Sequence, residues 1–163
     1  MRAIDKGLTA GAHSLPLIGT GDWNDGMNRV GAQGRGESVW LGWFLHVVLR
    51  QFIPLCENRD PARAARYTSE ASRLADMLEQ SWDGEWYLRG YYDDGAPLGS
   101  AQNDDCRIDS IAQSWAVLSA GPPGSTSETR APFVPAKPNA WTISGVMFCI
   151  DTPIHPLTTL PFF

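Results

Sequence analysis

The sequence carries little positive charge. Its 163 residues include 13 lysines and arginines against 18 aspartates and glutamates, which gives a formal net charge of −5. Nucleic-acid binding needs a basic face that neutralises phosphates, so this balance argues against a DNA or RNA partner. Hydrophobic residues nevertheless make up 43% of the chain, enough for the core of one domain of ordinary size.

No long hydrophobic run is present either. No stretch approaches the roughly 18 consecutive apolar residues of a membrane span. The N-terminal residues MRAIDKGLTAGAHSLPL also lack the continuous apolar core of a signal peptide. We therefore expect a soluble, cytoplasmic chain with no membrane segment of its own.

Cysteine is scarce. Cys56, Cys106 and Cys149 lie far apart and are odd in number, so they match neither metal-ligand spacing nor a disulfide framework. We expect buried or incidental thiols and no bound metal ion. Tryptophan, in contrast, occurs seven times. Its flat apolar face with a polar N–H at the edge suits both a protein core and a sugar-binding cleft.

The chain divides into three regions of different character. Residues 1–37 are rich in glycine and include the polar stretch GTGDWNDGMNRVGAQGRGES, and long loops of this kind are usually functional. Residues 38–120 have the patterns of packed helices with one hairpin. Residues 121–163 contain eight prolines and no sustained periodicity, so we expect a divergent, disordered tail.

Two consecutive helices are predicted in the middle region. Residues 38–55 are apolar on every side, which indicates an inner helix that is buried all round. The next helix begins with Asp60 as its cap and Pro61 at its first position, and its apolar residues recur every three or four positions. That pattern predicts an outer helix with one buried face. An inner helix followed by an outer one is the unit of an α/α barrel, although two helices alone also fit other packings.

A hairpin and a further helix are predicted downstream. The aromatic run at residues 85–92 lies between Asp83-Gly84 and Asp94-Gly95, which favours a strand or hairpin. Residues 107–120 return to a helical period. We expect three further tryptophans to pack in the core: Trp82, Trp86 and Trp115.

The residues with the clearest chemistry lie in the stretch Gly21–Asn28, GDWNDGMN. An EF-hand reading fails, because placing Gly26 sixth puts Trp23 at the third, ligating position. Breaking a glycosidic bond requires a carboxylic acid beside a surface that holds the sugar ring, and Asp25 with Trp23 supplies both. The common alternative is that aspartate and asparagine side chains here merely hold a turn.

Four motifs in order resemble the catalytic region of glycoside hydrolase family 94. They are LPLIGTGDWNDGMNRVG, GESVWLGWFL, WDGEWYLRGYYDDGAPLGS and CRIDSIAQSWAVLSA. The family includes cellobiose and chitobiose phosphorylases and the C-terminal part of cyclic β-1,2-glucan synthases, and the wording GTGDWNDGMNRVG is most similar to the glucan synthase branch. The motifs cover residues 1–120.

The resemblance implies a fold, a reaction and a set of site residues. It implies a mainly α structure, here part of an (α/α)6 barrel with a β-hairpin insertion. It also implies an inverting phosphorylase that acts on β-glucans with inorganic phosphate as co-substrate and no cofactor. Asp25 falls on the general acid and Trp23 on the residue that contacts the sugar. We also place Asp22, Arg89 and Arg107 in the substrate-binding cleft, ranked after Asp25 and Trp23.

Two features of the sequence leave alternatives open. The family's phosphate-binding motifs are not recognisable in residues 121–163, so we expect a fragment that is inactive alone and self-associates through exposed core. Such a chain would be a non-catalytic remnant that at most binds glucan, cut from a parent that is cytoplasmic or at the inner membrane. The other alternative is an inverting hydrolase, with Asp104, Asp105 or Asp109 as its second carboxylate. We expect His46 to be a packed histidine with its hydrogen bonds satisfied, whereas Gln113 suits a structural or a functional role equally.

Overall fold

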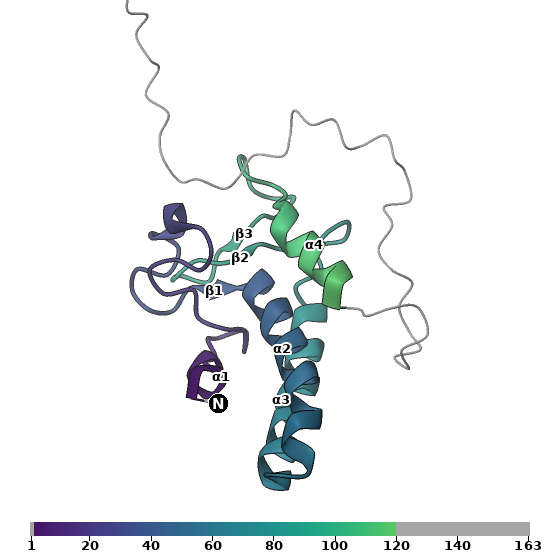
Figure 1. The fold of residues 1–163 in the computed structure, drawn as a ribbon. Coiled ribbons are helices and arrows are strands. Elements are labelled where there is room, and N and C mark those ends of the chain that lie inside the picture. Colours follow the sequence, from purple (N-terminus) through teal and green to yellow (C-terminus); the bar gives the residue numbers. More distant parts are fainter. Residues whose placement is uncertain (1, 120–163) are drawn as a thin grey trace, which may run out of the picture.

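Helices and a small antiparallel sheet make up residues 2–119, the part of the chain that this computed structural model describes (Figure 1). The elements are α1 (Arg2–Gly7), the 3-10 turn η1 (Asp25–Met27), β1 (Glu37–Ser38), α2 (Val39–Glu57), α3 (Pro61–Glu79), β2 (Gly90–Tyr91), β3 (Pro97–Leu98) and α4 (Ser110–Ser119). About half of the described residues are helical, beside a small three-stranded sheet, so the mainly α prediction is confirmed in part. The prediction of a disordered tail falls on residues outside this range.

Helix α2 is the central element, and α3 and α4 pack against it. It begins where the Ser38 side chain accepts a hydrogen bond from the backbone N–H of Leu41. Trp43 and Leu49 are buried in the core, as expected of an inner helix. Burial all round is wrong, however, because Leu55 is 65% exposed and Phe44 is 38% exposed. Trp115 of α4 covers Phe44 in part, whereas Leu55 near the end of the helix is largely exposed.

The length and hydropathy of α2 differ from the sequence expectation on membrane segments. It is the one helix among residues 2–119 that is long and apolar enough to cross a membrane, with a mean hydropathy of 1.4. The core helix of a soluble protein meets the same criterion, and α2 contacts α3 along its length (Figure 1). Length and composition therefore do not distinguish the two cases.

Helix α3 confirms the predicted outer helix. The Asp60 carboxylate accepts a hydrogen bond from the N–H of Arg63 at 3.1 Å, and Pro61 occupies the first turn. One face is buried against α2, and it consists of Ala64, Tyr67, Ala71, Leu74 and Leu78. The two helices approach closely at Gly42, where an added Cβ would lie 2.8 Å from Leu78 Cδ2.

The sheet is shorter than the aromatic run suggested. Its order is β1-β2-β3, with Ser38 opposite Gly90 and Gly90 opposite Leu98. The prediction of a hairpin is right, but its second strand lies beyond Asp94-Gly95, which forms the turn. Gly90 is required by close approach, since an added Cβ would lie 2.2 Å from the backbone oxygen of Glu37.

Helix α4 packs through aromatic side chains on the start of α2. Trp115 meets Phe44 edge-on with ring centroids 5.1 Å apart, and it lies 6.1 Å from Trp40. Core packing is thus confirmed for Trp115, and Trp82 packs edge-on against Tyr87. Leu118, near the end of α4, is 63% exposed.

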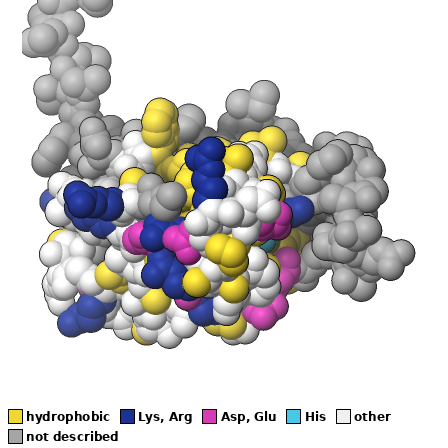
Figure 2. All heavy atoms as spheres, turned by 60° about the horizontal axis from the view of Figure 1, so that its bottom comes forward, with side chains coloured by type: hydrophobic (Ala, Val, Ile, Leu, Met, Phe, Trp, Pro, Cys, Tyr) yellow, Lys and Arg dark blue, Asp and Glu magenta, His cyan; other side chains and the backbone are white. Residues whose placement is uncertain are grey.

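Polar and ionic contacts fasten α1 to α3. The Asp5 carboxylate accepts hydrogen bonds from Arg66 and from the Tyr67 hydroxyl, and it lies 3.7 Å from Arg63. On the face shown in Figure 2, basic side chains accordingly lie beside acidic ones. The sequence does not predict α1, because its six residues are too few to show the regular spacing of apolar residues that indicates a helix.

The prediction that His46 is packed with its hydrogen bonds satisfied is wrong in part. The Nδ1 atom of His46 is buried and has no hydrogen-bond partner within residues 2–119, so this histidine is packed but not satisfied. Burial, with Arg50 nearby, lowers its pKa and favours the neutral ring. Cys56 is a buried free thiol as expected.

Candidate active site

The candidate site is the segment Asp22–Asp25, which we call the DWND loop. Local turn chemistry shapes it: Asn24 is the N-cap of η1, and its side chain accepts a hydrogen bond from the N–H of Gly26 at 2.9 Å. Gly21, just before the loop, has φ 142°, a conformation that favours glycine. The expectation that such side chains hold a turn is therefore correct for Asn24.

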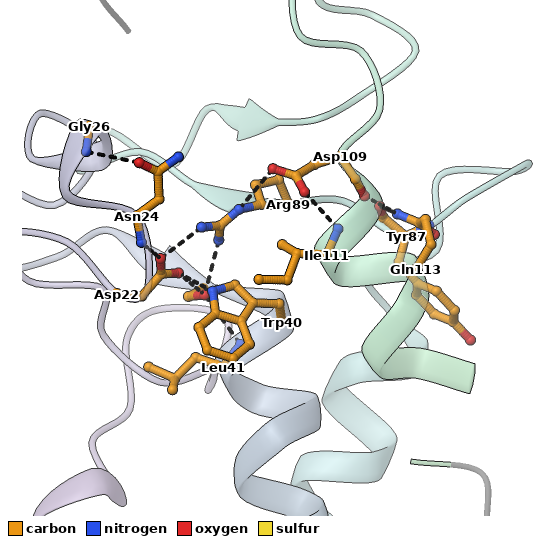
Figure 3. A network of polar contacts seen from close by, with 11 residues as sticks. Asp22, Asn24, Gly26, Trp40, Leu41, Tyr87, Arg89, Asp109, Ile111 and Gln113 are labelled. Carbon is orange, nitrogen blue, oxygen red and sulfur yellow. Dashed lines mark hydrogen bonds and ion pairs between the residues drawn. The ribbon is translucent and has the colours of Figure 1, made fainter. Parts of the chain in front are cut away.

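Asp22 anchors the loop in a buried polar network (Figure 3). Its side chain is fully buried, and Oδ1 accepts a hydrogen bond from Arg89 Nη2 at 2.8 Å. Its second oxygen, Oδ2, accepts from the Ser38 hydroxyl at 2.7 Å and from the indole N–H of Trp40. Burial alone would raise the pKa of Asp22, but the hydrogen bond and charge of Arg89 outweigh it and lower the pKa.

Arg89 is the centre of the network. It is 2% exposed and lies between two carboxylates, with its Nε donating to Asp109 Oδ2 at 3.1 Å (Figure 3). The other oxygen of Asp109 accepts from the backbone N–H of Ile111 at the start of α4. Burial raises the pKa of Asp109, although the charge of Arg89 opposes the shift. The guanidinium of Arg89, the residue before β2, thus links Asp22 of the DWND loop to Asp109, the residue before α4.

Ser38 and Gln113 complete the network. The Ser38 hydroxyl donates to Asp22 and accepts from Arg89 Nη1 at 3.2 Å, besides capping α2. Gln113 accepts from the backbone N–H of Tyr87 at 2.9 Å and donates to its carbonyl at 2.7 Å. These two bonds give Gln113 a structural role in tying α4 to the strand segment.

Trp23 lies next to the anchored Asp22 and has the opposite environment. It is 77% exposed, the largest exposed fraction among the big hydrophobic side chains of the described residues. The flat apolar face of an exposed indole, with its polar N–H at the edge, suits a sugar ring. Asp25, the first residue of η1, follows two positions later.

The other predicted site residues lie apart from this network. Arg107 is exposed and donates to the backbone oxygen of Ala101 at 2.8 Å. Asp104 and Asp105 are exposed as well. The roles assigned to Asp22, Trp23, Asp25, Arg89 and Arg107 toward substrate stay predictions, because no substrate contact is described.

Sequence reasoning missed Glu37, a buried residue of β1 next to Ser38. It is 1% exposed, and its Oε2 lies 2.6 Å from Nδ1 of His13. The His13 ring stacks on Tyr91 with centroids 3.6 Å apart. A glutamate in a glycine-rich loop is ordinarily solvated, so the sequence gives no signal of this burial.

Metal-ligating side chains and pockets are the other features that could mark a binding site. Within residues 2–119, no group of three or more His, Cys, Asp and Glu side chains could hold a metal ion. A pocket of about 460 Å³ lies where α2 ends and α3 begins, and its lining includes Phe52, Leu55 and Arg59. That is the far end of α2 from Ser38, roughly 27 Å along the helix at 1.5 Å per residue.

The sequence is similar to known proteins over most of its length. The family model described as the glycosyl hydrolase 94 superfamily, catalytic domain, matches residues 1–134, beyond Ala120 where the motifs found in the sequence end. Cyclic β-(1,2)-glucan synthase NdvB of Rhizobium meliloti (strain 1021) is 59% identical over 121 residues, which are 72% of this chain and 4% of that protein.

Two phosphorylases of Paenibacillus borealis are also similar. The 3-O-β-D-glucopyranosyl-β-D-glucuronide phosphorylase is 43% identical over 111 residues, 67% of this chain and 14% of its own length. The solabiose phosphorylase is 34% identical over 154 residues, 93% of this chain and 18% of its own length. The chain thus spans 4–18% of the length of these three relatives.

Proposed function

The chain belongs to the glycosyl hydrolase 94 superfamily, and from that membership we propose that it contributes the acid-bearing loop of an inverting glycoside phosphorylase domain that acts on β-glucans. A partial (α/α)6 barrel is the architecture proposed with it. The relatives with this similarity include a β-1,2-glucan synthase and disaccharide phosphorylases, which supports a carbohydrate partner.

The observation that carries the proposal is the contrast between adjacent residues of the DWND loop. Asp22 is fully buried and held by Arg89 and Ser38, so the start of the loop is fixed. Trp23, the next residue, is 77% exposed on that fixed support. A rigid backbone with an outward aromatic side chain is what a sugar platform requires, because its position is set before substrate arrives.

In the proposed reaction, Asp25 protonates the departing glycosidic oxygen. Inorganic phosphate attacks the anomeric carbon from the opposite face, the bond between that carbon and the leaving oxygen breaks, and a glycosyl phosphate of inverted configuration forms. Because phosphate is already anionic, no second carboxylate is needed to activate a nucleophile. The lowered pKa of Asp22 keeps it ionised at neutral pH, so Asp22 is not proposed as the proton donor.

The hydrolase alternative has less support. Asp109, the buried candidate for a water-activating base, is held by the charge of Arg89 and by the N–H of Ile111, which suits a structural role in the network. Asp104 and Asp105 are exposed, outside the buried network. The remaining alternative is a remnant that at most binds glucan. Such a remnant would form no product, whereas a phosphorylase would form a sugar phosphate.

The test is a chimera, because the chain spans a small share of its relatives. This chain would replace the aligned segment of the 43% identical phosphorylase of Paenibacillus borealis. Incubation with the host's disaccharide and phosphate should yield a sugar phosphate, and the chain alone should yield no product. A free sugar would indicate a hydrolase, and an inactive but folded chimera would favour the remnant.

The chimera also tests Asp25. Asp25→Asn keeps the shape of the side chain but cannot deliver a proton, which should lower the rate about a hundredfold to ten-thousandfold. An aryl glycoside, whose phenolate leaves without help, should retain more of its rate than the natural disaccharide. Asp104→Asn, the same change at an exposed carboxylate, is the control. Equal losses on both substrates for Asp25→Asn would contradict its role as the acid.

A further inference from the structure

Glu37 is a buried carboxylate whose charge is stabilised almost entirely by one short segment. Its Oε1 accepts from the backbone N–H groups of His13 and Leu15, each at 3.0 Å. Its Oε2 accepts from the His13 N–H at 3.1 Å and contacts His13 Nδ1 at 2.6 Å. Within residues 2–119, Glu37 makes no ion pair with lysine or arginine, so residues 13–15 provide its hydrogen-bond partners.

The segment that binds Glu37 is a tight turn built around the carboxylate. The N–H of Ser14 donates to the carbonyl of Gly11 at 3.0 Å, and Ser14 has φ 58°. At Gly11 an added Cβ would lie 2.4 Å from Cδ of Glu37. The carboxylate therefore occupies the space that a side chain at position 11 would need, and the turn closes around it.

This turn continues directly into the DWND loop. Residues 15–18 run antiparallel to residues 36–38: the N–H of Ser38 donates to Pro16 at 2.9 Å, and the N–H of Ile18 donates to Gly36 at 2.9 Å. Four residues after Ile18, Asp22 meets the Ser38 hydroxyl. Residues 13–22 form a stem that β1 holds at both ends.

Successive residues of a strand point to opposite faces, so Glu37 and Ser38 hold the stem from two sides. Ser38 fixes its end through Asp22, and Glu37 fixes its beginning through the turn at residues 11–15. We propose that Glu37 is a positioning residue, which sets the place of Trp23 by holding this turn. The sugar-binding part of this inference rests on the proposed function.

The experiment compares Glu37→Gln with Glu85→Gln in the full chain by hydrogen exchange and mass spectrometry. The glutamine side chain of the Glu37→Gln variant would present an amide N–H2 to backbone donors and lose at least one charge-assisted hydrogen bond. Amides of residues 11–25 should exchange roughly tenfold to a hundredfold faster, while those of α3 keep the wild-type rate. Glu85 is exposed, so its variant should exchange as wild type throughout.

A binding measurement links the exchange to function. A β-1,2-linked gluco-oligosaccharide is titrated against each variant, followed by tryptophan fluorescence, and Glu37→Gln should bind about tenfold or more weakly than Glu85→Gln. Unchanged exchange in residues 11–25, equal acceleration in α3, or an unchanged affinity despite faster exchange would each overturn the proposal. If Glu37→Gln does not fold, His13→Ala is measured in its place: it removes the ring contacts with Glu37 and Tyr91 but keeps the backbone N–H donors. Faster exchange in residues 11–25 is then expected, and unchanged exchange there would overturn the proposal.

These results separate the two hypotheses. If the wild-type chain binds no oligosaccharide, the sugar-binding part of this inference fails, the chimera still decides the proposed function, and local exchange still decides whether Glu37 holds the stem. If wild type binds sugar and exchange is unchanged in Glu37→Gln, the proposed function stands and the positioning role fails.

Discussion

Replacing Arg89 with methionine should destabilise the chain severely at neutral pH. Methionine fills similar space but removes the charge between Asp22 and Asp109, whose side chains are 0% and 12% exposed. Breaking a buried ion pair by removing one partner typically costs about 3–5 kcal/mol, because the remaining charge stays buried and uncompensated. The free energy of unfolding of a typical domain is about 5–15 kcal/mol, so this loss is a large share of it.

The pH dependence gives this prediction its sign. In the wild type, Arg89 holds the pKa of Asp22 below its ordinary value of 3.8, so that Asp22 stabilises the fold above that pH and loses its contribution as the pH falls. Without Arg89, burial remains and raises the pKa of both carboxylates in the folded state. The variant then loses stability as the pH rises. Lowering the pH from about 7 to about 5 should therefore reduce the difference in free energy of unfolding between Arg89→Met and wild type.

Urea unfolding followed by circular dichroism at the two pH values measures this effect. Arg107→Met is the matched control, because Arg107 is exposed and donates to one carbonyl. It should cost less than about 1 kcal/mol. An Arg89→Met midpoint equal to that of Arg107→Met, or a deficit that does not change with pH, would show that the buried charges are not what Arg89 stabilises.

Three further predictions use separate parts of the chain. Trp23→Ala should weaken oligosaccharide binding about tenfold in calorimetry yet change the free energy of unfolding by less than about 0.5 kcal/mol, since the side chain is 77% exposed; a large stability loss would contradict a platform role. Asp60→Ala should cost about 0.5–2 kcal/mol by loss of the α3 cap, whereas the exposed Asp76→Ala should cost less; equal losses would refute the cap. Leu118→Ser should shift sedimentation toward monomer, because Leu118 is 63% exposed; a monomeric wild type would exclude self-association through this face.

The helices and their order could be predicted from local signals. Asp60 and Pro61 mark the start of α3 through their own backbone chemistry, and the three- and four-residue spacing of apolar residues gives its buried face. The exposure of Leu55 could not be predicted in the same way, because an apolar residue on a helix shows a potential contact and not whether a neighbour fills it.

The candidate site was predictable only in part. The DWND loop stands out by composition and by family resemblance, and turn chemistry explains Asn24. The partners of Asp22 are not predictable from spacing, since Arg89 is 67 positions away and its burial depends on how the hairpin docks. Glu37 is harder still, because the residue type favours solvent and only the surrounding N–H groups make burial tolerable.

The long separations within the polar network bear on the order of folding. Helices α2 and α3 are joined by a short connection, so their contacts close small loops and should form early. The contact of Asp22 with Arg89 closes 67 residues, and Asp109 lies a further 20 beyond Arg89. During synthesis, a chain that has emerged only as far as residue 85 would therefore contain the α2–α3 pair and Ser38, while Asp22 of the DWND loop still lacked its ion pair with Arg89.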